Sequence, residues 1–305
     1  MFQFYDIHGP INTITEETAV TVGVFDGVHH GHQALFHQLS TLNSQLSTLV
    51  VTLTAHPSFV LGRRNNEYWL DDSEEHLRLL FEAGAKYVAV LPFTREVAQL
   101  SACEMARLLY GKLNMRSLLL GYDSRFGSKQ NDDFDRLPQL ATELSFTLQR
   151  GEPFLIDDAP ISSSRIRESL LQGAVEETAT LLGRPYTITG TVLHGRGVGH
   201  TLGFPTANID LSQTRKMLPK DGVYFVKVKG ERLKVKGMAN LGAIPTYGID
   251  RPTLEVHLLD FNGNLYGKTI TVEFVHRLRD IVHFESSEAL QHQLQQDLEQ
   301  IKQWS

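Results

Sequence analysis

The first part of the sequence alternates short apolar runs with segments of helical periodicity, and this alternation restricts the folds open to it. The apolar runs predict buried strands of a parallel sheet. They are Ala19–Val24, Leu49–Leu53, Tyr87–Leu91 and Ser117–Leu120. The segments between and after them predict helices at Gln33–Leu39, Glu74–Ala83, Ala102–Leu109, and near Ile166–Leu171 and Glu176–Leu182. Together they predict a doubly wound α/β domain, in which ligands bind at the carboxyl ends of the strands.

Two helix ends carry local signals. Ser101 and Glu104 have the spacing of a capping box, in which each side chain bonds to the other residue's amide. Gly84 follows the second predicted helix, where a glycine commonly ends a helix.

The pattern of apolar residues changes after Leu182. Five strand-like segments follow, separated by turns rich in glycine, proline, asparagine and aspartate. They are Tyr186–Leu193, Val223–Val228, Leu233–Ala239, Leu254–Phe261 and Ile270–Val275. No helical pattern interrupts them until Ser287–Gln303, whose apolar residues recur on one face. Five or six strands and a terminal helix predict a small β-barrel with a helix packed against it. We therefore expect two domains, residues 1–183 and residues 184–305.

Composition argues against several classes of protein. The 305 residues have a formal net charge of −6 and an isoelectric point near 6.1, so the basic surface of a nucleic-acid-binding protein is missing. Cys103 is the only cysteine, which excludes an intramolecular disulfide and suits a reducing compartment. The opening residues lack the basic and apolar regions of a signal peptide, and no apolar run reaches the length of a membrane span. We expect a cytoplasmic protein without nucleic-acid or membrane partners.

A glycine-rich turn, GVFDGVHHGH from Gly23 to His32, directly follows the first predicted strand. Such a turn brings backbone amides close to phosphate oxygens, and the following helix adds a partial positive charge. His29 and His32 have HxGH spacing and can donate hydrogen bonds to a phosphoryl group as charge develops. The same residues also fit a tight Asp-Gly turn with exposed histidines. A third alternative is a metal site of His29, His30 and His32, although further ligands at zinc spacing are missing.

Two later segments favour a nucleotide site. Gly121–Gly127 reads GYDSRFG and follows the fourth predicted strand, where a ligand-lining loop is expected. Ile161–Glu168 reads ISSSRIRE and precedes a helix. Its serines can cap that helix and its arginines can reach phosphates as planar donors. Alone, this segment fits a simple capped helix as well. With the first turn, it predicts phosphate binding.

The second half opens with a glycine-rich segment that ends in Pro205-Thr206-Ala207-Asn208. Its glycines let the backbone approach a nucleotide closely, although the chain has no Walker A motif. Thr206 and Asn208 are two residues apart, so they lie on one side of an extended segment, and their oxygens suit Mg²⁺ bridging ATP phosphates. Glu255 lies between apolar neighbours and can act as the base that a kinase needs near an attacking hydroxyl. A Gly/Pro-rich turn and a solvent-facing carboxylate are the structural alternatives.

These motifs resemble, in sequence order and over nearly the whole chain, those of the bacterial bifunctional riboflavin kinase/FAD synthetase family. The first half carries GxFDGVHxGH, His56-Pro57, GYDxRFG and ISSxxIR, and the second carries GFPTAN, ANLG, PTYG, LEVHLLDFNGNLYG and RLRD. The resemblance implies a nucleotidyltransferase-like α/β domain that adenylylates FMN, followed by a riboflavin kinase barrel. It implies riboflavin and FMN as substrates, ATP as co-substrate and Mg²⁺ as cofactor.

The resemblance also implies roles for individual residues. In the first half, His29, His32 and Arg167 would act at the reacting phosphates, and the nucleotide would bind to Gly23, Phe25, Asp26, Gly27, Asp123, Ser163 and Ser164. In the second half, Glu255 would be the base, Thr206 and Asn208 would hold the metal, Gly195, Gly197 and Gly203 would bind the nucleotide, and Asn240 and Arg279 would lie near the flavin. The chain departs from the family's pattern at Ala55, Ser124, Gln130, His200 and Ile281.

Two other functions fit part of the sequence. A different HxGH transferase, acting on a pantetheine or polyol phosphate, explains the first half and leaves the predicted barrel unexplained. A flavin-responsive binding or regulatory protein would keep the fold without the chemistry. The presence of Glu255, Thr206, Asn208, His29 and His32 together favours an enzyme.

Overall fold

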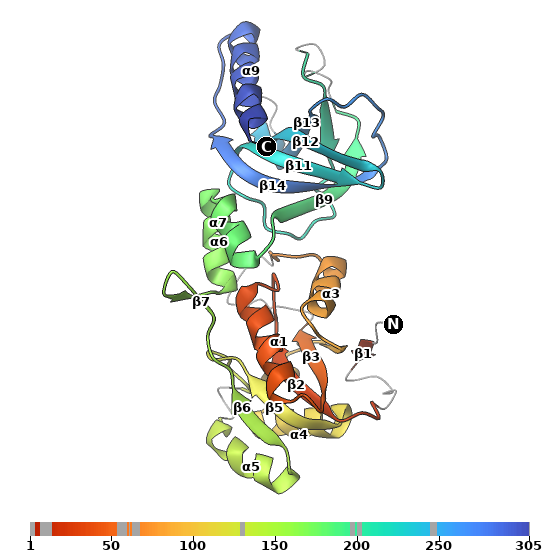
Figure 1. Ribbon diagram of the computed structural model, residues 1–305, viewed down its shortest axis with the longest axis vertical. Coiled ribbons are helices and arrows are strands. Elements are labelled where there is room, and N and C mark those ends of the chain that lie inside the picture. Colours follow the sequence, from red (N-terminus) through yellow and green to blue (C-terminus); the bar gives the residue numbers. More distant parts are fainter. Residues whose placement is uncertain are drawn as a thin grey trace. The chain divides into compact units, whose positions relative to one another are not determined.

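The chain forms two compact units, Met1–Ser163 and Ser164–Ser305, which are described separately. The computed structural model describes residues 4–6, 14–53, 60, 62, 68–128, 132–195, 199, 203–244 and 249–304 (Figure 1). Several residues singled out in the sequence lie outside these ranges. They are Ala55, His56, Pro57, Gln130, Gly197, His200 and the PTYG motif at 245–248.

The first unit is built on a parallel sheet with strand order β1-β4-β3-β2-β5-β6. Every described pair in it is parallel. In sequence order the strands are β1 (Phe4–Asp6), β2 (Thr18–Gly23), β3 (Ser47–Leu53), β4 (Tyr87–Leu91), β5 (Met115–Leu120) and β6 (Thr147–Arg150). The central strands are apolar throughout because helices cover both of their faces.

Helices cover the sheet on two sides, which makes it doubly wound (Figure 1). On one face, α1 (His30–Leu42) and α3 (Ser73–Glu82) pack Phe36, Leu39 and Leu80 against Val50 and Val88. On the other face, α4 (Ala102–Leu113) and α5 (Leu137–Leu144) form a second core with the alternate residues of the same strands. The unit also contains two 3-10 turns and a short hairpin, η1 (Val97–Gln99), η2 (Phe134–Arg136), β7 (Leu155–Ile156) and β8 (Ala159–Pro160).

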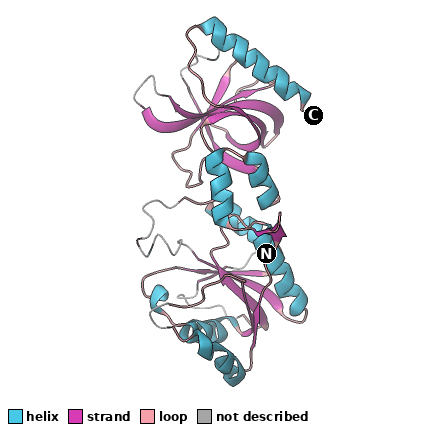
Figure 2. Cartoon of the chain, turned by 90° about the vertical axis from the view of Figure 1, so that its left-hand side faces the viewer, coloured by secondary structure: helices cyan, strands magenta, loops and turns pink. Residues whose placement is uncertain are grey.

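The second unit is a closed antiparallel barrel with strand order β10-β13-β12-β11-β14-β9 (Figure 2). Its strands are β9 (Tyr186–Leu193), β10 (Thr206–Ile209), β11 (Gly222–Gly230), β12 (Leu233–Ile244), β13 (Ile249–Leu258) and β14 (Thr269–Arg279). Tyr186, Tyr224 and Phe274 are the largest fully buried side chains of the barrel. Outside it, α9 (Ser287–Gln303) packs Ile301 against Phe225.

Two helices between the sheet and the barrel strands are grouped with the barrel. They are α6 (Ser163–Gln172), of which only Ser163 belongs to the first unit, and α7 (Val175–Leu182). Glu176 accepts a hydrogen bond from His276 Nδ1 at 2.9 Å, and Leu170 O accepts one from Lys220 N at 2.8 Å. We predicted these helices as the close of the first half, with the domain boundary between residues 183 and 184; that boundary stays a prediction.

The predicted fold class is confirmed: a doubly wound α/β unit precedes a small barrel with a terminal helix. The capping box of Ser101 and Glu104 is present, and Gly84 has a φ of +105° just after α3. The prediction for the first helix was wrong in one respect, because α1 begins at His30 and not at Gln33. The HxGH motif therefore spans a helix N-terminus. The sequence analysis assigned no separate strand or helix to β1, β6, α5, the β7–β8 hairpin or β10.

Candidate active sites

The glycine-rich turn lies at the carboxyl end of β2, which pairs with β3 on one side and β5 on the other. Phe25 and Val28 have φ values of +52° and +37°, which is rare for residues with a side chain and is held only where the surroundings enforce it. The ring of Phe25 lies beneath Gly23, where any Cβ would come within 2.8 Å of it. The Phe25 side chain is therefore packed against Gly23 and is 5% exposed.

His29 and His32 are brought together at the start of α1. His29 is buried and caps the helix, with its Nδ1 accepting a hydrogen bond from His32 N at 3.4 Å. The two rings stack with their centroids 3.6 Å apart. Burial, His29 and His76 together hold the pKa of His32 well below its usual range, so His32 is a neutral hydrogen-bonding group. Its Nδ1 is buried and has no hydrogen-bond partner among the described residues.

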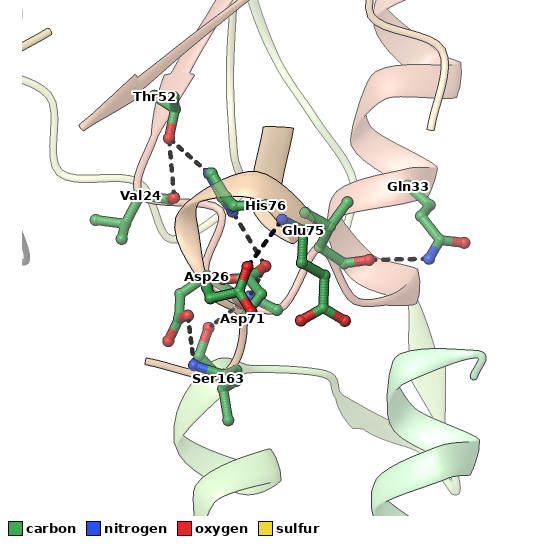
Figure 3. Close-up of polar contacts among 12 residues, drawn as sticks. Val24, Asp26, Gln33, Thr52, Asp71, Glu75, His76 and Ser163 are labelled. Atoms are coloured by element: carbon green, nitrogen blue, oxygen red, sulfur yellow. Dashed lines mark hydrogen bonds and ion pairs between the residues drawn. The ribbon is translucent and has the colours of Figure 1, made fainter. Parts of the chain in front are cut away.

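Ser163 joins this turn from far along the chain, because its Oγ donates to Asp26 O at 3.0 Å (Figure 3). Asp123 is exposed in the loop after β5, whose backbone is held by Arg150 bonding to Tyr122 O at 3.0 Å. Ser164 and Arg167 lie in the first turns of α6, in the second unit. The structure thus joins Ser163 to the histidine turn, and its described contacts do not join Asp123 to it.

Two carboxylates join the turn to the residues just before α3, one accepting a hydrogen bond in each direction. Asp26 Oδ1 accepts from Leu70 N at 2.8 Å, and Asp71 Oδ2 accepts from Gly27 N at 3.0 Å (Figure 3). Both aspartates are buried, at 2% and 3% exposure. Asp71 was not predicted from the sequence, because an Asp-Asp pair before a helix resembles an ordinary N-cap; Asp72 does cap α3. The burial of Asp71 next to the histidine turn is visible only in the structure.

In the barrel, the strand register aligns four predicted residues in one row. Asn208 lies opposite Glu255, Glu255 opposite Asn240, and the row continues through Val223 to Arg279. Directly opposed residues on antiparallel strands have Cβ atoms about 4.5–5.5 Å apart. The sequence neighbours of Glu255 are fully buried inside the barrel, so this row faces outward.

The predicted metal ligands lie beside that row. Thr206 is on the same face of β10 as Asn208, opposite His257, whose Nδ1 donates to Pro205 O at 2.9 Å. The Asn208 amide packs against Gly195, where a Cβ would lie 2.1 Å from Asn208 Nδ2. A hydroxyl oxygen and an amide oxygen on one face are hard donors that fit Mg²⁺ with phosphate and water as its other ligands. Among the described residues, no three His, Cys, Asp or Glu side chains form a metal-binding group.

Two of the predicted barrel residues have a visible structural role. Arg279 pairs with Asp297 of α9: its Nη2 lies 2.7 Å from Asp297 Oδ2 and its Nε lies 3.1 Å from Asp297 Oδ1. This bidentate pair ties α9 to the end of β14. Gly203 has a φ of +83°, which favours glycine in the turn before β10.

Family models match both units of the chain. One described as FAD synthetase matches residues 11–165, and one described as riboflavin kinase matches residues 182–305. In the part of the chain that the structure describes, no helix is long and apolar enough to cross a membrane.

Full-length relatives agree with the family models. Proteins named bifunctional riboflavin kinase/FMN adenylyltransferase from Haemophilus influenzae and Escherichia coli K12 are each 35% identical over 295 residues. These matches cover 95% of this chain and 95% and 94% of the relatives. A solved structure from Streptococcus pneumoniae, described as a macrolide-efflux protein, is 32% identical with a TM-score of 0.88, covering 96% of this chain and 97% of its own. The resemblance read from the motifs is confirmed, and the chain belongs to the family of bifunctional riboflavin kinase/FMN adenylyltransferases.

Proposed function

We propose that this protein phosphorylates riboflavin to FMN and then adenylylates FMN to FAD, using ATP in both steps. The observation that carries the kinase half is the row of Asn208, Glu255 and Asn240 on three neighbouring barrel strands. The observation that carries the transferase half is the stacked pair of His29 and His32 at a helix N-terminus. Family membership supports both halves.

In the kinase reaction, the terminal ribityl hydroxyl oxygen attacks the γ-phosphorus of ATP and ADP leaves. We assign Glu255 as the base that orients this hydroxyl and takes its proton. Asn240, directly opposite Glu255, is placed to contact the flavin substrate on the same face. Thr206 and Asn208 would hold Mg²⁺, which supplies positive charge to the ATP phosphates when bound. Gly195, Gly197 and Gly203 would let the backbone lie close to the nucleotide.

In the transferase reaction, a phosphate oxygen of FMN attacks the α-phosphorus of ATP and pyrophosphate leaves. Neither step needs a covalent enzyme intermediate, because positioning and charge stabilisation carry most phosphoryl chemistry. We assign His29 and His32 as hydrogen-bond donors to the reacting phosphates. Gly23, Phe25, Asp26 and Gly27 would offer backbone groups of the turn. Ser163, Ser164 and Arg167 would close over the triphosphate, and Asp123 would contact the nucleotide.

We also propose that the protein works in the cytoplasm and that its two activities separate between residues 183 and 184. The single free cysteine suits a reducing compartment. The riboflavin kinase model begins at residue 182, two residues before the proposed second domain, and the FAD synthetase model ends at residue 165.

The test uses the full chain with riboflavin, ATP and Mg²⁺, and separates FMN and FAD by chromatography. Glu255→Gln is expected to lower FMN formation by about 10²-fold or more while FAD still forms from added FMN, because the base is lost and the shape kept. His29→Ala is expected to stop the sequence at FMN. Glu231→Gln, an exposed carboxylate in the turn after β11, is the matched control. Near-parental FMN formation by Glu255→Gln would remove Glu255 from the mechanism, and parental FAD formation by His29→Ala would make the HxGH turn structural.

A further inference from the structure

A buried network behind the histidine turn has no assigned role in either reaction. It links the turn to β3 and to the first turn of α3 through Asp71, His76 and Thr52 (Figure 3). His76 Nδ1 lies 3.0 Å from Asp71 Oδ2, and His76 Nε2 lies 2.9 Å from Thr52 Oγ1. Thr52 Oγ1 in turn donates to Val24 O at 3.2 Å. The network therefore reaches the backbone of the turn at two points, Val24 and, through Asp71, Gly27.

Both ring nitrogens of His76 are engaged. An ionised carboxylate only accepts hydrogen bonds, so Nδ1 donates to Asp71. The Thr52 hydroxyl lies within hydrogen-bond distance of both His76 Nε2 and Val24 O, so the ring ties β3 and the residue after β2 to α3.

The burial of Asp71 makes its contacts costly to lose. Its side chain is 1% exposed and that of His76 is 13% exposed. A carboxylate taken out of water is costly unless hydrogen bonds compensate it. His76 Nδ1 and Gly27 N both donate to Asp71 Oδ2, at 3.0 Å each.

His76 also lies close enough to act on His32. Burial is the main cause of the low pKa of His32, and the charges on His29 and His76 lower it further. His76 therefore favours the neutral form of His32 while it holds the turn.

We propose that His76 is a positioning residue for adenylyl transfer. Through Asp71 and Thr52 it holds the backbone of Val24 and Gly27 in the strained shape that presents amides to the nucleotide phosphates. This proposal rests on the proposed FAD-forming activity of the same site. Removing the ring should therefore slow the FAD-forming step and leave the affinity for ATP nearly unchanged.

The experiment measures kcat and KM for FAD formation from FMN and ATP by the full chain. His76→Phe removes both hydrogen bonds, and His76→Lys keeps a donor for Asp71. We expect His76→Phe to lower kcat roughly tenfold or more with a change in KM for ATP below about threefold. We expect His76→Lys to restore most of kcat. His37→Lys, on an exposed face of α1, is the matched control.

Kinase activity of the same preparations reports whether the second unit is intact, and circular dichroism reports the first. If His76→Phe fails to fold, the kcat of His76→Lys decides, and a value roughly tenfold or more below the parent overturns the role. Parental kcat in His76→Phe, or a kcat in His76→Lys no higher than that of His76→Phe, overturns the positioning role while leaving the proposed function intact. A parent that forms no FAD from FMN and ATP overturns both.

Discussion

Substituting Gly195 by alanine tests whether the position of Asn208 matters to the kinase. Gly195 does not have a positive φ, so alanine fits its backbone. The new Cβ would lie 2.1 Å from Asn208 Nδ2, 2.6 Å from its Cγ and 2.9 Å from its Oδ1. Ordinary contact begins at 3.4 Å, so the amide must retreat by more than an ångström.

Gly195→Ala should lower the free energy of unfolding only slightly and the kinase rate strongly. The clashing atoms are the far end of a side chain that can rotate, and an off-rotamer torsion costs about 0.5–1.5 kcal/mol. The free energy of unfolding should therefore fall by about 1 kcal/mol or less. A displacement of about 1 Å at a reacting centre can cost roughly 10²-fold in rate, equivalent to about 2.7 kcal/mol in the barrier. We expect the kinase to lose roughly 10²-fold.

The assay follows riboflavin phosphorylation, with urea unfolding of the same samples. Gly230→Ala is the matched control, since its Cβ meets nothing closer than 3.4 Å and its φ is not positive. FAD formation from added FMN should stay at the parental rate in both variants, because Gly195 belongs to the barrel unit.

A double-mutant cycle tests whether the loss of kinase activity acts through Asn208. In an Asn208→Ala background the clash disappears, so Gly195→Ala should then cost little further activity. Equal losses in both backgrounds would show that the effect does not pass through Asn208. A parental kinase rate in the single Gly195→Ala variant would refute the reasoning that places Asn208 at the reacting phosphates.

Three further predictions concern the barrel unit. Asn208→Ala should weaken the kinase and be partly rescued by excess Mg²⁺ in a metal titration; an unchanged Mg²⁺ dependence would contradict the ligand assignment. Asp297→Ala should lower the free energy of unfolding by about 3 kcal/mol. The Asp297 side chain is 4% exposed, and without it the Arg279 guanidinium loses its bidentate partner. A urea midpoint equal to that of the parent would contradict this. A fragment of residues 184–305 should convert riboflavin to FMN without forming FAD, and a fragment of residues 164–305 should unfold at a higher temperature because α6 and α7 pack on the barrel. Equal unfolding temperatures would show that those contacts contribute nothing to the stability of the barrel.

Elements with a regular pattern of apolar residues were predictable from the sequence with little error. Tyr87–Leu91, Tyr186–Leu193 and Ser287–Gln303 have the predicted bounds, because the period of their buried residues is a property of the local chain. Short elements without such a pattern were not predictable. β10 has four residues between glycine- and proline-rich turns, and it is a strand only because β9 and β13 pair with it.

The candidate sites divide in the same way. The sequence predicted the HxGH turn, Thr206 with Asn208, and Glu255, since the chemistry of these residue types and their local spacing are visible in one dimension. It did not predict that α1 begins inside the HxGH motif, because the cap depends on the backbone of the preceding turn. Nor did it predict that Arg279 is held by Asp297, which lies on another element.

The sequence by itself determined the two-part architecture, the approximate places of most strands and helices, and the residue types available for phosphoryl chemistry. Only the tertiary structure decided which of these residues meet. Asn208, Asn240 and Glu255 are far apart in the chain and form one row through barrel register. Asp71 and His76 reach the histidine turn through contacts between β3, α3 and the end of β2. Local propensities predict most elements, whereas register, burial and short strands such as β10 depend on how distant elements pack, and no local pattern encodes that.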